Sequence, residues 1–429
     1  MKAIQRRSFL KASFSSIAAG ALLTEMGREP LLAKARTTAG VLSQADDSEA
    51  YWELVKAQFT FDSGLYYFNN ASLGPSPELV ADATENFRRT LDGFPSKYMW
   101  GGWNTDKELV REKAARAVGA SPEEIALIHN TTEGMNVVAA SMDLEPGDEV
   151  ILADHEHSSG TIPWKYWQET KGIKLVRPTL PLLPESPGEI VDVYRRAITP
   201  RTRVISMCHM INTNGMILPV REVAELARPR NILVAVDGAQ SAGMFPFDLH
   251  EMGCDYFAAS SHKWLFSPKG VGIFYARREA QEHLRPLIVA SGYEDESVRR
   301  FENYNTRNLP ELLGLGVAID FNNLLGPERK GERIFGLKRY FRERISDRPD
   351  FSMKTPASDE LSAGIITVEL VGHPVGDVER TLADEFNINV RPMSSFGLNG
   401  LRISLSVFNT KEDIDYLVDA LEEISAGKA

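Results

Sequence analysis

Two segments near the middle of the chain carry residue types that could do chemistry. The first is the apolar, β-branched run 232–236, which ends on Asp237. The second is the run 256–259, which ends in Ser260-Ser261-His262-Lys263. Short apolar runs of this kind predict strands buried on both faces of a parallel sheet. Because ligands bind outside the carboxyl ends of such strands, both the acid and the lysine are placed to meet one.

A lysine among aromatic and apolar neighbours can have its ammonium desolvated and its pKa lowered, as a Schiff-base amine requires. A carboxylate on the adjoining strand end can pair with a protonated pyridine nitrogen. Asp237 and Lys263 are therefore the minimum set for pyridoxal 5'-phosphate, whose ring acts as an electron sink. The alternative is that Asp237 is an ordinary turn acid and Lys263 a surface lysine.

The order of these motifs resembles that of a known family. Asp237-x-x-Gln240, then Ser260-x-His262-Lys263 and then Pro268-Lys269-Gly270 are similar to the class V aminotransferases, which are fold-type I pyridoxal-phosphate enzymes. That family includes cysteine desulfurases, isopenicillin N epimerase-like enzymes and kynureninases. The resemblance extends beyond about residue 60, and it implies that Lys263 is the catalytic amine, held in a Schiff base.

The resemblance also assigns residues to the cofactor's phosphate. Thr131 and Thr132 open a helix directly after the strand 126–130, and a helix start of this kind binds anions. Ordinary capping of the helix by threonine is the alternative. Ser260 and His262 are expected at the same phosphate. Thr306 is expected to reach the phosphate of the neighbouring subunit, which implies a homodimer with shared active sites, although Asn305 stands where the family usually has glycine.

Three further side chains are assigned to the cofactor ring. By position, His157 resembles the family residue that stacks on the pyridine ring. A metal site with His155 is the alternative, but an i, i+2 pair on an extended segment diverges and no third ligand is evident, so we predict no metal. Asn212 and Gln240 resemble the residues that hydrogen-bond the phenolic oxygen of the ring.

Substrate residues follow from two more segments. Arg402, in Gly400-Leu401-Arg402-Ile403-Ser404, resembles the arginine that binds the substrate α-carboxylate, a bidentate role that lysine fills less well. The alternative is a surface arginine at a strand end. Asn70 resembles a residue at the mouth of the active site. The desulfurase branch carries a nucleophilic cysteine in the segment that corresponds to 390–397, where this chain has none, so we do not expect a desulfurase.

The elements around these residues predict an α/β fold of fold-type I. We expect a large domain over 66–310 with a mostly parallel, doubly wound sheet, because strand and helix patterns alternate there. A smaller α/β C-terminal domain is expected over 311–429, with strands at 364–370, 389–391 and 401–406. Helices are expected at 78–91, 106–118, 219–228, 311–325 and 411–424.

The N-terminus predicts export. Arg6-Arg7-Ser8-Phe9-Leu10-Lys11 is a twin-arginine pattern, a mildly apolar run follows, and Ala33-Lys34-Ala35 resembles a cleavage site, so residues 1–35 are expected to be a signal peptide. Residues 36–65 are expected to form a polar linker with a short helix at 49–58. The twin-arginine export machinery would carry the folded protein to the periplasm with its cofactor bound. A basic, disordered N-terminus is the alternative.

Composition excludes several other classes. The net charge is −11 with no basic stripe outside the N-terminus, which argues against nucleic acid as a partner. No apolar stretch is long enough to predict a stable membrane anchor. The two cysteines, Cys208 and Cys254, show no metal-ligand spacing. Cys208 is expected to be a buried hydrophobic residue, and a disulfide between the two is conceivable only in an oxidising compartment.

A narrower resemblance concerns the substrate. In size, signal and motif order the chain resembles exported class V enzymes that modify the glutamate side chain of the siderophore pyoverdine to succinamide. This implies a periplasmic enzyme that acts on an amino-acid or peptide amine. The alternatives are a class V aminotransferase or epimerase for a free amino acid, and a cofactor-binding protein without turnover. A metal-dependent hydrolase that uses His155 and His157 is a further alternative.

Overall fold

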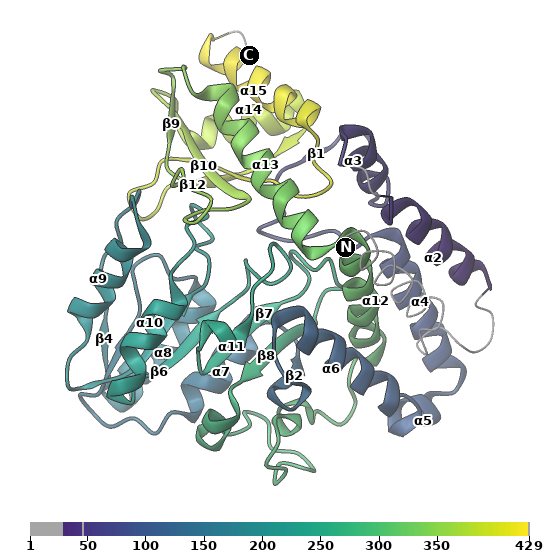
Figure 1. Ribbon diagram of the computed structural model, residues 1–429, viewed down its shortest axis with the longest axis vertical. Coiled ribbons are helices and arrows are strands. Elements are labelled where there is room, and N and C mark those ends of the chain that lie inside the picture. Colours follow the sequence, from purple (N-terminus) through teal and green to yellow (C-terminus); the bar gives the residue numbers. More distant parts are fainter. Residues whose placement is uncertain (1–28, 45–46, 428–429) are drawn as a thin grey trace, which may run out of the picture.

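A seven-stranded sheet forms the core of the computed structural model, which describes residues 29–44 and 47–427 (Figure 1). Its order is β2-β8-β7-β6-β5-β3-β4. β8 runs antiparallel to both of its neighbours, and the remaining pairs are parallel. The strands are β2 (Ile125–Ile128), β3 (Glu149–Ile151), β4 (Lys174–Val176), β5 (Thr202–Cys208), β6 (Leu233–Asp237), β7 (Tyr256–Ser260) and β8 (Gly272–Ala276).

Helices cover both faces of this sheet, because successive strand residues point to opposite sides. In β2, Ile125 and Leu127 enter one apolar cluster while Ala126 and Ile128 enter another. The second cluster is closed by α7 (Thr131–Ser141) and α8 (Ser158–Lys171). The first is closed by α4 (Glu78–Gly93), α6 (Asn104–Val118), α9 (Pro187–Ala197), α10 (Val220–Ala227), α11 (Leu249–Met252) and α12 (Leu309–Leu325). The predicted doubly wound, mostly parallel sheet is confirmed.

The smaller domain is built on a second sheet, which is antiparallel and has the order β12-β13-β10-β9. Its strands and helices enclose a separate apolar cluster, so it has its own core. The predicted smaller α/β domain is confirmed. Its elements are α13 (Pro327–Ile345), β9 (Phe351–Met353), β10 (Ile365–Leu370), α14 (Val375–Phe386), β11 (Ile388–Asn389), β12 (Arg391–Met393), β13 (Gly400–Ser404) and α15 (Lys411–Ser425).

The borders between the two domains differ from those expected at residues 66 and 311. α12 packs with α4 and α6 in the core of the large domain, so the chain leaves that domain near Gly326, at the end of the helix. β1 (Tyr66–Tyr67) pairs in parallel with β11 of the small domain. The segment that follows β1 therefore starts in the small domain and enters the large one.

The segment expected to be a polar linker is helical at 36–42 and 49–56. Helix α2 (Glu29–Leu42) runs across the predicted signal boundary at residue 35 and lies along α4 (Figure 1). Within it Leu31 and Ala35 are buried, and Lys34 pairs with acids of α4. The expected short helix is confirmed as α3 (Glu49–Lys56). The twin-arginine pattern at Arg6-Arg7 lies outside the described residues.

The remaining features are one short helical turn and the lengths of the helices. α5 (Pro95–Lys97) is a single turn that follows α4. Among residues 29–44 and 47–427, no helix is both long and apolar enough to cross a lipid bilayer.

Candidate active site

The carboxyl end of β6 places Asp237 between two neighbouring strands. Asp237 lies opposite Cys208 of β5 and Ala258 of β7, and only 4% of it is exposed. Its Oδ1 accepts a hydrogen bond of 2.9 Å from the backbone N–H of Ala239. The intervening Gly238 is required, because a Cβ there would lie 1.9 Å from the ring of Phe257. The acid is thus held in one orientation at the sheet edge.

Lys263 lies in a turn whose backbone carbonyl oxygens accept hydrogen bonds from other segments of the chain. The His262 carbonyl accepts a 3.0 Å hydrogen bond from the N–H of Gly74. The Lys263 carbonyl accepts one of 3.3 Å from Asn70 Nδ2, and the Trp264 carbonyl accepts one from Lys330 Nζ of α13. Three consecutive carbonyls are therefore bound by side chains or backbone from distant parts of the chain.

Two residues predicted to touch ligands also hold this turn. Asn70 is fully buried and bonds the Lys263 carbonyl, rather than lying at the mouth of the site. Gln240 accepts a 2.9 Å hydrogen bond from the indole of Trp264 and donates one of 2.9 Å to the Ala71 carbonyl. Both side chains therefore position the backbone around Lys263. A contact of Gln240 with the cofactor ring stays a prediction.

Electrostatics connect the lysine, the acid and the predicted substrate arginine. Burial lowers the pKa of Lys263 to about 8, although the carboxylate of Asp237 raises it and the guanidinium of Arg402 lowers it further. The charges of both groups therefore act on the amine. At neutral pH such a lysine is much more often in the free-base form than a solvated lysine is.

The start of α7 and the end of β7 meet, as the predicted phosphate site requires. Ser260 Oγ lies 3.0 Å from the backbone N of Thr131 and 2.9 Å from its hydroxyl. The helix is capped by Asn130, which accepts from the N–H of Glu133, so capping by threonine was wrong. Thr132 is exposed on the first turn. Thr131 and Ser260 are brought together where an anion would meet the positive end of the helix dipole.

His262 and Thr306 differ in their surroundings. His262 is half-buried, its Nδ1 has no hydrogen-bond partner within the described chain, and burial with nearby Lys263 and Lys269 lowers its pKa to about 4. Thr306 is exposed in the loop 303–308. Asn305 has a φ of 55°, so it adopts the left-handed conformation that glycine favours. This explains why asparagine is tolerated at a position where the family has glycine.

The two histidines after β3 point to different partners. His157 is accessible at the surface, and partial desolvation lowers its pKa; Asp237 raises this pKa, and Lys263, Arg402 and Arg391 lower it further. Its Nδ1 accepts from the N–H of Ser159, so the neutral ring carries its proton on Nε2. His155 is buried and stacks on Phe396. Within the described residues no cluster of three or more potential metal ligands occurs.

Arg402 is brought into the site from the small domain. It is 2% exposed and donates to Asn69 Oδ1 at 2.9 Å, Ser72 Oγ at 2.6 Å and the Asn212 carbonyl at 3.1 Å. All three acceptors are neutral, and no carboxylate of the described residues lies within ion-pair distance. Burial and the neighbouring Arg391 lower its pKa to about 10. Asn212 meets the site through its backbone, and the role of its side chain stays a prediction.

Glu156 is a site residue that the sequence analysis missed. It is buried, its Oε1 accepts a 3.1 Å hydrogen bond from the N–H of Cys208, and burial together with Asp237 raises its pKa to about 8. A Cβ on Gly160 would lie 3.8 Å from Asp237 Oδ2 and 3.9 Å from Glu156 Oε2, so the two acids border the same space. Its place between the two histidines was the only signal in the sequence.

Neither cysteine is available for the conceivable disulfide. Cys208 lies at the carboxyl end of β5 and Cys254 just before β7, which places them at opposite edges of the sheet, and both are free and buried. Burial raises the pKa of both thiols.

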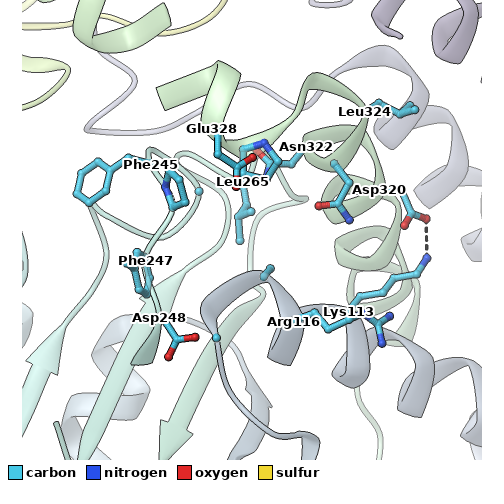
Figure 2. Close-up of a pocket in the computed structure, with 16 residues that line it drawn as sticks. Lys113, Arg116, Phe245, Phe247, Asp248, Leu265, Asp320, Asn322, Leu324 and Glu328 are labelled. Carbon is cyan, nitrogen blue, oxygen red and sulfur yellow. Dashed lines mark hydrogen bonds and ion pairs between the residues drawn. The ribbon is translucent and has the colours of Figure 1, made fainter. Parts of the chain in front are cut away.

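A separate cavity of about 600 Å³ is lined by other residues (Figure 2). It is lined by residues of α6 and α12 and the loop 243–248, and Lys113 reaches Asp320 across one wall. None of the predicted site residues lines it.

The residues present fit pyridoxal phosphate. A buried acid lies beside a lysine of lowered pKa, and hydroxyls gather at a helix start. Ser261 Oγ and His262 Nδ1 are buried without partners in the described chain, as groups that await an anion would be.

Comparison with known proteins agrees with this geometry. The family model described as aminotransferase class-V matches residues 66–417. The chain belongs to the class V aminotransferase family. It is 33% identical over 393 residues to the isopenicillin N epimerase of Streptomyces clavuligerus, covering 88% of this chain and 99% of the relative. It is 30% identical to the cysteine desulfurase of Serratia proteamaculans, covering 84% and 93%.

Solved structures of other proteins share the fold. The cysteine desulfurase CsdA of Escherichia coli superposes with a TM-score of 0.76 at 26% identity, covering 89% of this chain and 99% of that one. A C-DES variant with glycine covalently linked to its pyridoxal-phosphate cofactor has a TM-score of 0.76 at 22% identity, covering 85% and 98%. The prediction of fold-type I is confirmed, and membership of the class V aminotransferase family confirms pyridoxal phosphate as the cofactor.

Proposed function

We propose that this class V enzyme takes the free amine and carboxylate of an amino acid, or of a peptide end, and labilises bonds at the α-carbon. The observation that carries the proposal is the pair formed by Lys263, with its lowered pKa beside Asp237, and Arg402, which is buried without a carboxylate partner in the described chain. A buried, unpaired guanidinium is costly unless an anion completes it. A substrate carboxylate would do so.

The cofactor would be held by groups already in place. Asp237 would face the ring nitrogen, His157 the ring, and Thr131 with Ser260 the phosphate. When bound, pyridoxal phosphate supplies an electron sink for the charge that develops at the substrate α-carbon. The lowered pKa of His157 keeps its imidazole neutral near pH 7, so it can lie against the ring without adding a charge.

Two side chains act on the substrate in this proposal. Arg402 binds the α-carboxylate through its forked N–H groups, and Asn69 and Ser72 fix the orientation of the guanidinium. Lys263, with a pKa of about 8, can accept and return the proton at the α-carbon near neutral pH. The segment 66–74 positions both groups, because it contacts Arg402 and the lysine turn.

The experiment is borohydride reduction of the purified protein followed by peptide mapping. We expect the cofactor to be fixed on Lys263, with Lys269, an exposed lysine six residues away, unmodified as the internal control. A Lys263→Ala protein should carry no covalent cofactor. Unmodified Lys263 in the wild-type map would contradict the proposal. A protein that keeps the cofactor on Lys263 but never changes its absorbance with any amine would be the alternative, a binding protein without turnover.

We propose further that the reaction is not sulfur transfer. Desulfurases are among the relatives, but this chain has no cysteine in residues 390–397, and burial raises the pKa of the Cys208 and Cys254 thiols. A thiol rather than a thiolate is a poor nucleophile. Cysteine should therefore release no sulfide above the rate of a Cys208→Ser, Cys254→Ala double variant, and a higher wild-type rate would overturn this.

A homodimer with shared active sites is also proposed. Thr306 is exposed, and large apolar side chains are exposed at Phe94, Trp100 and 287–289, which is typical of surfaces that another chain covers. Light scattering on the holoenzyme should give twice the mass of the chain. Thr306→Ala should then weaken cofactor binding and leave the mass of the dimer unchanged. A monomer with full activity would contradict the proposal.

For the substrate, we propose the glutamate side chain of pyoverdine, converted to succinamide in the periplasm after twin-arginine export. The support is the motif order, the size of the chain and the Arg6-Arg7 pattern. Pyoverdines of the wild type and a Lys263→Ala strain should differ at this side chain, and cell fractionation should find the protein in the periplasm. If the siderophores are identical, a free amino acid remains as the substrate and transamination or epimerisation as the reaction.

A further inference from the structure

Two arginines face each other across the strand pair that brings Arg402 into the site. Arg391 of β12 lies directly opposite Arg402 of β13 in the antiparallel register. Residues directly opposite in such a pair have their side chains on the same face, and like charges at these positions destabilise the sheet. The structure thus holds two guanidinium groups close together at the substrate-binding edge.

Neither guanidinium is neutralised by the protein. The side chain of Arg391 is exposed and makes no hydrogen bond or ion pair with a described residue, while Arg402 binds only neutral oxygens. Arg402 is 2% exposed, and its Nε is buried without a partner in the described chain. Both arginines lower the pKa of His157, so the charges of both act at that histidine.

The loop that follows β12 contacts the large domain. Phe396 has a φ of 58° and stacks on His155 of the large domain at a centroid distance of 5.1 Å. The backbone of a bulky residue is strained in this conformation, so contacts with its surroundings must stabilise it. The stacking ties the small-domain hairpin to the segment that carries His157.

We propose that the substrate carries two anionic groups, an α-carboxylate bound by buried Arg402 and a second anion bound at the rim by Arg391. This rests on the proposed function, since it names the class of substrate for the same site. Asp237 is the carboxylate that faces Lys263, and neutral Glu156 adds little charge, so the positive charge of the pair is left for ligands. The second anion removes the repulsion between the two arginines.

The test compares ligands that differ by one charge at equal size. L-glutamate and L-glutamine are titrated into the holoenzyme, and binding is read from the absorbance of the bound cofactor. We expect glutamate to bind at least about tenfold more tightly, because a charge-assisted hydrogen bond to guanidinium is much stronger than one to a neutral amide. Arg391→Gln should abolish this preference and leave the affinity for glutamine unchanged. Arg195→Gln, at an exposed position of α9, is the matched control and should change neither affinity.

A second measurement needs no reaction of the ligand. Glutarate should raise the midpoint of thermal unfolding of the holoenzyme more than butyrate does, and Arg391→Gln should remove the difference. If no amine perturbs the cofactor, the proposed function fails. This inference is overturned if glutamate and glutamine bind equally or if no ligand stabilises the protein. It is also overturned if Arg391→Gln dissociates the dimer, because the arginine would then pair with the partner subunit.

Discussion

The contact between Gly74 and the lysine turn offers a sharp test of the site geometry. A Cβ at Gly74 would lie 2.1 Å from the Lys263 carbonyl oxygen and 2.7 Å from that of His262, both well inside the 3.0 Å limit of real Cβ contacts. These atoms are backbone and cannot rotate away. Gly74→Ala must therefore push the segment 70–74 from the turn and break the 3.0 Å hydrogen bond between its N–H and the His262 carbonyl.

The magnitude follows from these two losses. Overpacking of a tight contact costs about 1–3 kcal/mol, and the lost hydrogen bond costs about 1 kcal/mol. Together they lower the free energy of unfolding by about 2–4 kcal/mol. For a chain of this length, such a loss lowers Tm by about 2–5 °C.

The assay is thermal unfolding of apoprotein and holoenzyme, together with cofactor affinity. Gly376→Ala is the matched control, since Gly376 lies in α14 with no atom within 4 Å of the added methyl group, and alanine there should be neutral or stabilising by up to about 1 kcal/mol. Gly74→Ala should also weaken cofactor binding because Lys263 moves. Equal Tm and equal cofactor affinity in the two variants would refute the reasoning.

Three further predictions use the titrating groups. The pKa of Glu156 is raised to about 8 in the folded protein, so the stabilisation that comes from its protonated form is complete below about pH 4.5 and is lost as the pH rises through about 8. The gain in Tm of Glu156→Gln over the wild type should therefore grow from pH 5 to pH 9, and a constant difference would refute this. In the apoprotein, reductive methylation of Lys263 should reach half its maximal rate near pH 8 and at lower pH in Asp237→Asn, as mass spectrometry of the peptide would show; a midpoint near 10.5 would contradict it. Cys208 and Cys254 should resist a thiol reagent in the native protein and react with it in denaturant, whereas reaction of either in the native state would show that its burial is wrong.

The sequence predicted best what depends on neighbours in the chain. The apolar runs before Asp237 and Lys263 became β6 and β7, because strands buried on both faces need continuous apolar residues. The last helix begins at Lys411 and is capped by Thr410, as its hydroxyl and the acid three residues later indicate. In contrast, α8 was not predicted, since it contains Pro163 and its polar residues hide an amphipathic pattern.

What could not be predicted depends on contacts between distant segments. The sequence predicts Asn70 at the mouth of the active site. In the structure its side chain bonds the Lys263 carbonyl, which lies 193 residues away in the sequence. Gln240 is likewise bonded by Trp264 and Ala71, which no local pattern reveals. The helix of residues 29–42 was taken for signal and linker because its apolar face is short, and only the surface of α4 makes it a stable element.

The short strand β1 has a mechanical consequence. It pairs with β11 of the small domain, and the six residues after it bind Arg402, the lysine turn and Gln240 in succession. If the small domain swings outward to admit a ligand, this segment is restrained by its bonds to both the small and the large domain. The swing is therefore expected to pivot about residues 66–74, so that Arg402 and the lysine turn, both bound by this segment, stay close while the parts of the small domain farthest from it move most.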